Sequence, residues 1–287
     1  MDKKAAAKNL TSLLLFGLNG VVAGQIALSS YEIVFLRTFI GSILLTVLFL
    51  LGKGKFHIRE NKRDFLFVVI SGIAMGTSWM FLYEAYQEIG VSIGALLYYC
   101  GPVIVMIFSP LIFKEKLTLP KILGFITVLV GIYLVNGKGG GDKLNAWGVF
   151  CGVMSAVTYF VMVTFNKQSK KIVGLENPVI QLIVSFITVS VFMLVKQGLR
   201  IEIPPGAWGW ILILGVLNTG IGCYMYFSSL SALPVQTVAI FGYTEALSAV
   251  VFASVFLGET MSIPQIIGAV CIIGGAMAGE LIKGRKE

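Results

Sequence analysis

The sequence predicts an all-α integral membrane protein of ten transmembrane helices, arranged as two inverted five-helix repeats. Three observations lead to this prediction: long apolar segments separated by short charged ones, an uneven distribution of Lys and Arg between alternate loops, and an internal repeat. Hydrophobic residues make up 57% of the 287 residues and charged residues only 13%, against about 25% in soluble domains. A bilayer is therefore the expected solvent and partner for most of this chain.

Ten apolar segments are long enough to cross about 30 Å of hydrocarbon as helices. Several of the connections between them hold only a few residues, so consecutive helices are expected to run antiparallel and to pack as neighbours. The first segment lacks a signal-peptide cleavage pattern, and we expect it to remain as a helix. In chain order the predicted spans are Leu10–Leu28, Ile33–Leu51, Phe65–Tyr86, Val91–Phe113, Pro120–Asn136, Ala146–Phe165, Pro178–Val195, Ala207–Leu230, Val235–Leu257 and Pro264–Ile282.

The basic residues indicate how the chain lies in the membrane. Lys and Arg number 17 in the amino terminus and in the loops on the same side, four in the loops on the other side, and one, Arg37, within a span. Because cytoplasmic loops carry the excess of Lys and Arg, we expect both termini in the cytoplasm and the protein in the plasma (inner) membrane. The net charge of +8 is confined to short loops, which favours membrane orientation over nucleic-acid binding as its cause.

An internal repeat divides the chain. A shift of 144 residues aligns the third to fifth spans with the eighth to tenth, with ten identical pairs between residues 72–131 and 216–275. The predicted units are residues 1–136, an extracytoplasmic linker at 137–145, and residues 146–287. Each unit has an odd number of spans, so the second must enter the bilayer from the opposite face. Inverted repeats of this kind let a carrier alternate its accessible side, which predicts transport.

The sequence resembles the EamA-type carriers of the drug/metabolite transporter superfamily. The resemblance rests on the ten spans, on Phe35-Leu36-Arg37 in the second span, and on the paired motifs Phe113–Pro120 and Leu257–Pro264, each followed by glycine. It implies an exporter of amino acids and other metabolites, with a central cavity lined mainly by the first, third, fourth, sixth, eighth and ninth helices. One departure concerns substrate choice: Leu18-Asn19-Gly20 stands where such carriers often have tryptophan in the first helix. Another is Lys114, which replaces the usual glycine.

Glu245 is the first candidate for binding substrate or a proton. It lies near the centre of the ninth span, about 16 Å from either end, where an ionised carboxylate is costly unless paired or hydrated. Its partner in the repeat is Gly101, so symmetric packing does not require the carboxylate. Two interpretations are open: a neutral acid hydrogen-bonded to a neighbouring helix, and a group that binds a cationic moiety or a proton during transport.

Polar and aromatic side chains in the other cavity helices complete a predicted substrate pocket. Trp79, Tyr83 and Tyr86 share one face of the third helix, and Tyr86, at its end, is interpreted as an interfacial residue. Small-molecule sites combine apolar walls with a few polar anchors, and core packing is the alternative for each residue. The predicted substrate-binding residues are Asn19, Trp79, Tyr83, Tyr98, Tyr99, Ser155, Tyr159, Asn218, Tyr243 and Glu245, of which Glu245 is also the predicted proton-coupling residue.

Two further pairs of charged residues have structural interpretations. Arg37 and Glu84 lie at comparable depth below the outer face, and we expect a structural ion pair or an arginine that snorkels to the interface, with an outer gate or a carboxylate anchor as the alternative. Glu115 and Glu259 each precede a helix that has proline in its first turn, and each is expected to cap that helix.

Other functional classes lack their characteristic residues. The four cysteines lie singly in apolar segments, and the only histidine, His57, is in a basic loop. No Ser/His/Asp set, metal-ligand cluster or nucleotide motif is present, so we expect no metal, no cofactor and no enzymatic activity. A membrane-embedded enzyme and a non-transporting receptor are the alternatives from other classes.

The sequence thus predicts a transporter that exports small amphipathic metabolites, amino acids first, by alternating access. Proton exchange at Glu245 and facilitated diffusion are both open as its driving mechanism. The alternative within transport is efflux of aromatic or quaternary organic cations, for which a carboxylate among aromatic rings is a suitable receptor. We expect the monomer to be the functional unit.

Overall fold

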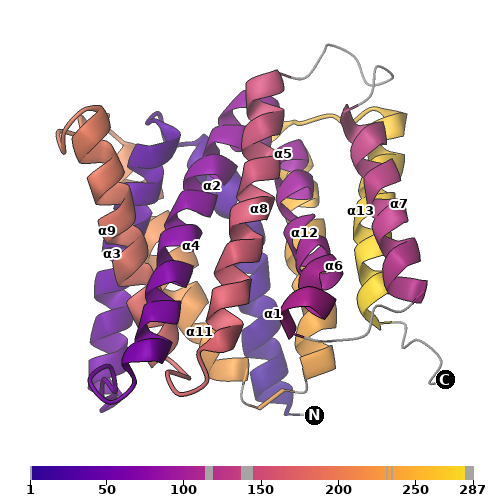
Figure 1. Ribbon diagram of the computed structural model, residues 1–287. Coiled ribbons are helices and arrows are strands. Elements are labelled where there is room, and N and C mark those ends of the chain that lie inside the picture. Colours follow the sequence, from indigo (N-terminus) through magenta and orange to yellow (C-terminus); the bar gives the residue numbers. More distant parts are fainter. Residues whose placement is uncertain (1, 114–118, 137–144, 231, 234, 282–287) are drawn as a thin grey trace.

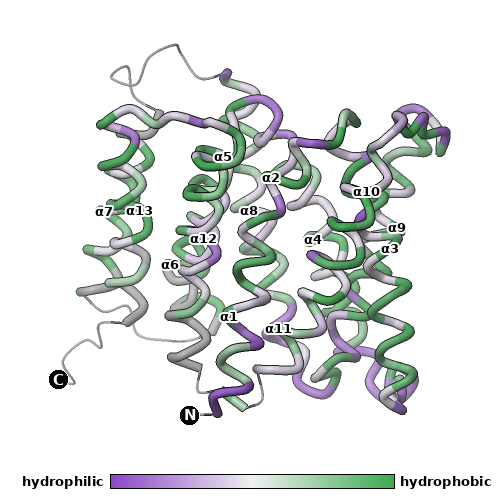
Figure 2. Tube along the Cα trace, turned by 180° about the vertical axis from the view of Figure 1, so that it is seen from behind, coloured by the Kyte–Doolittle hydropathy of each residue, from purple (hydrophilic) through white to green (hydrophobic). Residues whose placement is uncertain are grey.

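The computed structural model describes residues 2–113, 119–136, 145–230, 232–233 and 235–281. This part of the chain is all-helical, as the sequence predicts, and its helices run side by side in one bundle (Figure 1). Apolar residues follow the middle of the helices, while hydrophilic residues are concentrated at the two ends of the bundle (Figure 2). The distribution is that of a bundle whose outer surface meets lipid.

Local sequence signals account for several helix starts. The Asp2 side chain accepts hydrogen bonds from the backbone of Lys4 and Ala5 at the start of the first helix, and Ser29 with Glu32 forms a capping box at the third. The helices before the linker are α1 (Lys3–Gly17), α2 (Asn19–Gly24), α3 (Ser30–Leu51), α4 (Lys62–Ile89), α5 (Val91–Tyr98), α6 (Gly101–Phe113) and α7 (Leu119–Asn136).

The helices after the linker include an irregular one. A π-helical segment, η1, follows α10 directly and continues into α11, and such segments are frequent at functional sites. In order the elements are α8 (Ala146–Gln168), α9 (Glu176–Lys196), α10 (Ala207–Leu212), η1 (Ile213–Ile221), α11 (Gly222–Leu230), α12 (Val235–Leu257) and α13 (Ile263–Leu281).

Two predicted spans are interrupted helices. The first is divided at Leu18 between α1 and α2, and it begins at Lys3, seven residues earlier than predicted. The fourth is divided between α5 and α6, so that Pro102 lies in the first turn of α6, where a missing backbone N–H is tolerated. Apolar composition identified both segments, but it carries no information about a break inside them.

Six stretches are long and apolar enough to cross a membrane, and four apolar helical stretches of 10–17 residues are shorter. The long stretches are Lys3–Gly24, Ser30–Leu51, Lys62–Ile89, Ala146–Gln168, Glu176–Lys196 and Ala207–Ser229, and the shorter ones are Val91–Val105, Ile122–Leu134, Phe241–Leu257 and Ile263–Gly275. All of them overlap predicted spans. The ten-span count itself stays a prediction, because length identifies only the six.

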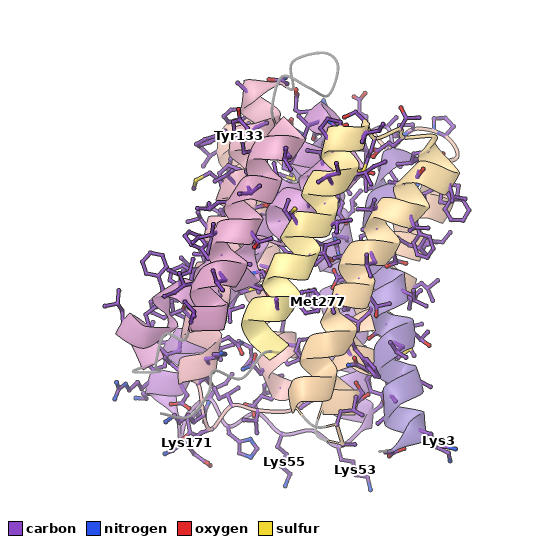
Figure 3. All side chains as sticks on the ribbon, turned by 90° about the vertical axis from the view of Figure 1, so that its right-hand side faces the viewer. Lys3, Lys53, Lys55, Tyr133, Lys171 and Met277 are labelled. Atoms are coloured by element: carbon purple, nitrogen blue, oxygen red, sulfur yellow. The ribbon has the colours of Figure 1, made fainter. Side chains whose placement is uncertain are left out.

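Lysines mark one end of the bundle. Lys3, Lys53, Lys55 and Lys171 lie at this end, here named the basic end, and Tyr133 lies near the opposite end (Figure 3). The start of α1 and the last turn of α13 are also at the basic end (Figure 1). The positive-inside prediction assigns this end to the cytoplasm.

The helix pair α7 and α13 forms one flank of the bundle (Figure 1). A Cβ atom on Gly131 would lie 2.7 Å from the carbonyl oxygen of Gly268, and one on Gly275 would lie 2.7 Å from that of Gly124. The two backbones are therefore in direct contact, as small residues permit between helices in lipid. Elsewhere α4 packs on α8 and α9, α3 on α9 and η1, and α1 on α11 and α12.

Candidate functional site

A cavity of about 210 Å³ lies among the helices near the middle of the bundle. It begins at Glu245, halfway along α12, and extends toward the basic end, where Pro178 and Gln181 lie in the first two turns of α9. Its lining comprises Phe16, Asn19, Arg37, Met75, Trp79, Tyr98, Tyr159, Met162, Pro178, Gln181, Leu182, Cys223, Tyr226, Phe227 and Glu245.

An apolar cluster separates this cavity from the opposite end. It joins α2, α3, α4 and η1 through side chains such as Val22, Ile33, Leu82, Tyr83 and Leu214, each at most 6% exposed. Because α3 enters from the opposite end and reaches this cluster before Arg37, the cavity lies on the basic-end side of it. This conformation therefore places the cavity closer to the basic end than to the opposite end.

Half of the predicted binding residues line the cavity: Asn19, Trp79, Tyr98, Tyr159 and Glu245. The rings of Tyr98 and Tyr159 meet edge to face with centroids 5.2 Å apart, so the two phenols form one aromatic wall.

Arg37 also lines the cavity, where it is only 3% exposed. Its Nε donates to Thr219 Oγ1 at 3.1 Å, and its Nη1 donates to the Tyr83 hydroxyl. The guanidinium also lies over the Trp79 ring, 4.2 Å from its centroid. Contacts from α4 and η1 thus fix the guanidinium of this α3 residue. The two hydrogen bonds use only part of its five N–H donors.

The predicted ion pair between Arg37 and Glu84 is not formed. Glu84 instead accepts hydrogen bonds from Ser30 and from Trp147 Nε1, the latter at 3.0 Å. Glu176, at the basic end, forms an ion pair with His57. The prediction was wrong because similar depth does not place two residues on facing sides of their helices. Arg37 lines the central cavity, whereas Glu84 lies at the outer surface of the bundle.

Glu245 and Arg37 bring one negative and one positive group into the same cavity. The Tyr99 hydroxyl lies beside the Glu245 carboxylate, and the Arg37 guanidinium interacts with it electrostatically. Gly101, the repeat partner of Glu245, has a different role: a Cβ there would lie 2.6 Å from the Tyr159 ring. The absence of a side chain at Gly101 therefore makes room for part of the aromatic wall.

The other predicted binding residues lie behind the cavity wall. Asn218 Nδ2 donates to the Leu15 carbonyl at 2.9 Å and to Asn19 Oδ1 at 3.2 Å, so it joins η1 to the break between α1 and α2. Tyr83 supports Arg37 and Tyr99 supports Glu245, as described above. Ser155 accepts a bond from Ser78 through its backbone carbonyl and Tyr243 packs in an apolar cluster, so both serve helix packing here.

Sequence reasoning missed several residues of the lining. Gln181 and Cys223 are examples, and the 144-residue shift of the repeat places Gln181 on Arg37 and Cys223 on Trp79. The alignment of residues 72–131 with 216–275 already pairs Cys223 with Trp79, and extending it toward the amino terminus into the second span would have found Gln181. The two copies thus contribute residues at equivalent positions of the cavity. Where one copy has a charged residue, the other has an uncharged one, as Arg37 and Gln181 show.

Glu259 does not cap the helix that follows it. Its carboxylate accepts the backbone N–H groups of Val91 at 2.6 Å and Ser92 at 2.8 Å, at the start of α5. Before α13, Gln265 Oε1 accepts hydrogen bonds from the backbone N–H and the hydroxyl of Ser262. Glu259 is therefore not needed there, and its carboxylate contacts the positive end of another helix. Its repeat counterpart, Glu115, lies outside the described residues. No group of three or more His, Cys, Asp or Glu suited to a metal ion occurs in the part of the chain that is described.

Comparison with known proteins identifies the family. A model of the EamA-like transporter family matches the chain twice, at residues 5–137 and 146–278. The chain therefore belongs to the EamA-like transporter family, whose members are transporters rather than enzymes. This result confirms the resemblance drawn from the sequence, and with the apolar helices it makes the protein a multi-pass membrane protein.

Individual relatives agree with this assignment. The uncharacterized transporter YxxF of Bacillus subtilis is 25% identical over 283 residues, covering 97% of this chain and 90% of the relative. An uncharacterized transporter of Archaeoglobus fulgidus is 23% identical, covering 93% of this chain and 92% of the relative. A solved crystal structure matches with a TM-score of 0.68 at 17% identity, covering 98% of this chain and 99% of the other, which shows a shared fold.

Proposed function

We propose that this protein exports small zwitterionic, amphipathic metabolites across the plasma membrane, with amino acids as the first substrate class. The observation that carries the proposal is the presence of Arg37 and Glu245 in one cavity with aromatic walls. An α-amino acid offers a carboxylate to the guanidinium and an ammonium to the carboxylate, and charge-assisted hydrogen bonds of this kind are the strong ones. The Trp79, Tyr98 and Tyr159 rings suit an apolar or aromatic side chain.

Proton exchange at Glu245 is the coupling step that we propose. A single carboxylate in a low-dielectric cavity is neutralised either by a proton or by the substrate ammonium, and leaving it bare is costly. The two ligands therefore exclude each other. Loading substrate on one side and a proton on the other would exchange them across the membrane.

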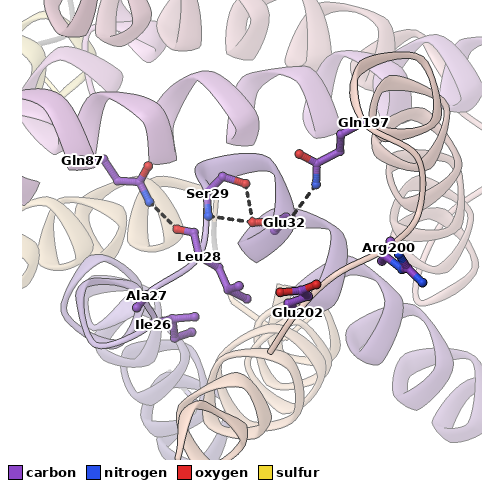
Figure 4. A pocket seen from close by; sticks show the side chains of 9 residues that line it. All are labelled: Ile26, Ala27, Leu28, Ser29, Glu32, Gln87, Gln197, Arg200 and Glu202. Atoms are coloured by element: carbon purple, nitrogen blue, oxygen red, sulfur yellow. Dashed lines mark hydrogen bonds between the residues drawn. The ribbon is translucent and has the colours of Figure 1, made fainter. Parts of the chain in front are cut away.

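Equivalent contacts on opposite faces support alternation between two inverted halves. Glu32 and Glu176, which are related by the 144-residue shift, both lie in the first turn of the second long helix of their half. Glu32 accepts from Gln197 Nε2 at 3.0 Å, in the loop after α9 (Figure 4). Glu176 accepts from the His57 backbone N–H at 2.6 Å and contacts His57 Nδ1 at 3.0 Å, in the loop after α3.

Each half therefore uses an equivalent carboxylate to hold a loop of the other half, one at the basic end and one at the opposite end. The reciprocal glycine contacts between α7 and α13 follow the same relation. The two matches of one family model add support from sequence. A carrier built from exchangeable halves can open to either side in turn.

Transport by purified protein in proteoliposomes tests the proposal. We expect uptake of labelled phenylalanine that rises with an opposing proton gradient, and loss of that gradient dependence in Glu245→Gln. Competition by phenethylamine, which lacks a carboxylate, is expected to depend on Glu245, and competition by 3-phenylpropionate, which lacks an ammonium, on Arg37. Unchanged rate and pH dependence in Glu245→Gln would exclude the carboxylate from the mechanism.

Efflux of aromatic cations is the second candidate. Glu245 lies beside the Tyr98 and Tyr159 rings, a combination that binds organic cations. Arg37 in the same cavity opposes a second positive charge, which is why the zwitterion is preferred. Transport of tetraphenylphosphonium in preference to phenylalanine in the same proteoliposomes would favour the cation.

A further inference from the structure

A second cavity, of about 420 Å³, lies on the outer surface of the bundle and shares no lining residue with the central one. It is formed over α4, between α8 on one side and α9 with the start of α3 on the other. Its lining comprises Ser30, Tyr31, Thr77, Met80, Phe81, Glu84, Trp147, Cys151, Thr188, Val191, Phe192 and Lys196. We name it the lateral groove.

The position of the lateral groove follows from helical spacing on α4. Thr77, Phe81 and Glu84 recur on one face, while Met75 and Trp79 face the central cavity. The groove runs along the helices for about 10 Å, from Thr77 to Glu84 at 1.5 Å per residue. It is thus parallel to the direction in which lipid chains lie.

One end of the groove is apolar. The Thr77 and Thr188 hydroxyls donate to carbonyls of their own helices, at 2.9 and 2.8 Å, which leaves their methyl groups for the groove. Met80, Phe81 and Val191 complete this end. Val191 is 55% exposed, so the groove opens onto the surface that meets lipid.

The other end of the groove has two opposite charges that do not pair with each other. The Lys196 ammonium lies over the Tyr31 ring, 4.3 Å from its centroid, and has no carboxylate partner among the described residues. Glu84 is held by Ser30 and Trp147 and likewise has no cationic partner there. Lys196 is the last residue of α9 and Trp147 lies in the first turn of α8. This end of the groove is therefore at the membrane boundary, where Tyr, Trp and Lys contact headgroups.

We propose that the lateral groove binds an aminophospholipid of the bilayer. An acyl chain fills the apolar end, the phosphate meets Lys196, and the primary ammonium of the headgroup meets Glu84. A zwitterionic headgroup satisfies both charges, whereas an anionic lipid leaves Glu84 facing a phosphate. This site is distinct from the transport cavity and does not depend on the proposed function.

Lipid binding to the purified protein tests the site. In dodecyl maltoside micelles, added dioleoylphosphatidylethanolamine is expected to raise the melting temperature in a saturable way, by mass action, and to be retained in native mass spectra. Dioleoylphosphatidylglycerol is expected to give a smaller shift. Soluble glycerophosphoethanolamine, which has the headgroup without the chains, should give none; a shift equal to that of the full lipid would overturn the role of the groove.

Variants locate the site. Lys196→Gln and Glu84→Gln are each expected to weaken retention of the ethanolamine lipid about two- to fivefold, the effect of losing one partly exposed charge contact. Lys53→Gln, at the basic end, serves as the matched control and should bind as the parent protein does. Equal retention in all three variants, or equal binding of the glycerol and ethanolamine lipids, would contradict the proposal. Because Glu84→Gln keeps the shape of the side chain and the two lysines are exposed, all three variants are expected to fold.

Discussion

At the scale of single residues, Arg37 is a buried charge whose fixed partners are neutral. Its bonds to Tyr83 and Thr219 and its stacking on Trp79 satisfy part of the guanidinium without neutralising it. A buried charge is costly unless it is paired, and such groups in membrane spans usually serve function. The remaining donors, and Glu245 in the same cavity, support the proposed role of Arg37 in binding a substrate carboxylate.

A double-mutant cycle separates the structural and functional parts of Arg37. Arg37→Met is expected to lower the free energy of unfolding by about 1–3 kcal/mol, because the buried Tyr83 hydroxyl loses its partner. Adding Tyr83→Phe should recover part of that loss, since no orphaned hydroxyl remains, whereas transport stays lost in both variants. Thermal melts and proteoliposome uptake measure the two effects. Additive destabilisation in the double variant would show that the two side chains are not coupled.

At the scale of elements, breaks and close contacts matter more than regular helix. The break between α1 and α2 lies beside the π-helical η1, and Asn218 joins them by bonding to Leu15 and Asn19. The break borders the central cavity through Asn19, and η1 is linked to the cavity through Thr219, which accepts a hydrogen bond from Arg37 Nε. Between α7 and α13, by contrast, glycine allows regular helices to meet backbone to backbone.

Neighbouring glycines on α13 provide a matched test of that contact. Gly275→Ala is expected to destabilise the protein by about 1–3 kcal/mol, because its Cβ would lie 2.7 Å from the Gly124 carbonyl oxygen. Gly274→Ala meets nothing within 4 Å and is expected to be neutral or to stabilise by up to about 1 kcal/mol through helix propensity. Melting temperatures of the two variants, measured in the same detergent, test this prediction. Similar melting temperatures would contradict the direct backbone contact between α7 and α13.

At the scale of the whole molecule, the two halves contribute equivalent positions but different chemistry. The 144-residue shift relates Glu32 to Glu176, and both hold a loop of the other half. The same shift relates Arg37 to Gln181 and Glu245 to Gly101, so the charges of the cavity come from one copy each. Such a division fits the proposed mechanism, in which the two halves share a scaffold and the proposed substrate site lies where their residues differ.

Membrane topology tests the inverted arrangement directly. An epitope at the carboxyl terminus is expected to be accessible only from the cytoplasm, and one inserted in the glycine run at residues 139–141 only from outside, because an odd number of spans separates them. Antibody labelling of intact and permeabilised cells measures both. Detection of the two epitopes on the same side would exclude five spans in the second half.

The sequence predicted the all-helical fold, the positions of the apolar helices and five of the fifteen residues that line the central cavity. Hydrophobic length and Lys/Arg distribution depend on the solvent of each segment, which is a local property of the chain. The breaks at Leu18 and before Gly101 could not be predicted in the same way, because apolar composition is the same on both sides of them. Glu259 was assigned to the wrong helix because the nearest helix start in space belongs to a distant part of the chain.

By itself, the sequence determined that the chain lies in a membrane, that it repeats, and that Glu245 differs from its repeat partner. Only the tertiary structure decided that Arg37 lines the central cavity together with Glu245 and does not pair with Glu84. Depth in the membrane follows from position along a helix, whereas the partner of a side chain follows from the rotation and neighbours of that helix. Rotation and neighbours are set by packing between segments far apart in the sequence, such as α3 against η1 and α7 against α13.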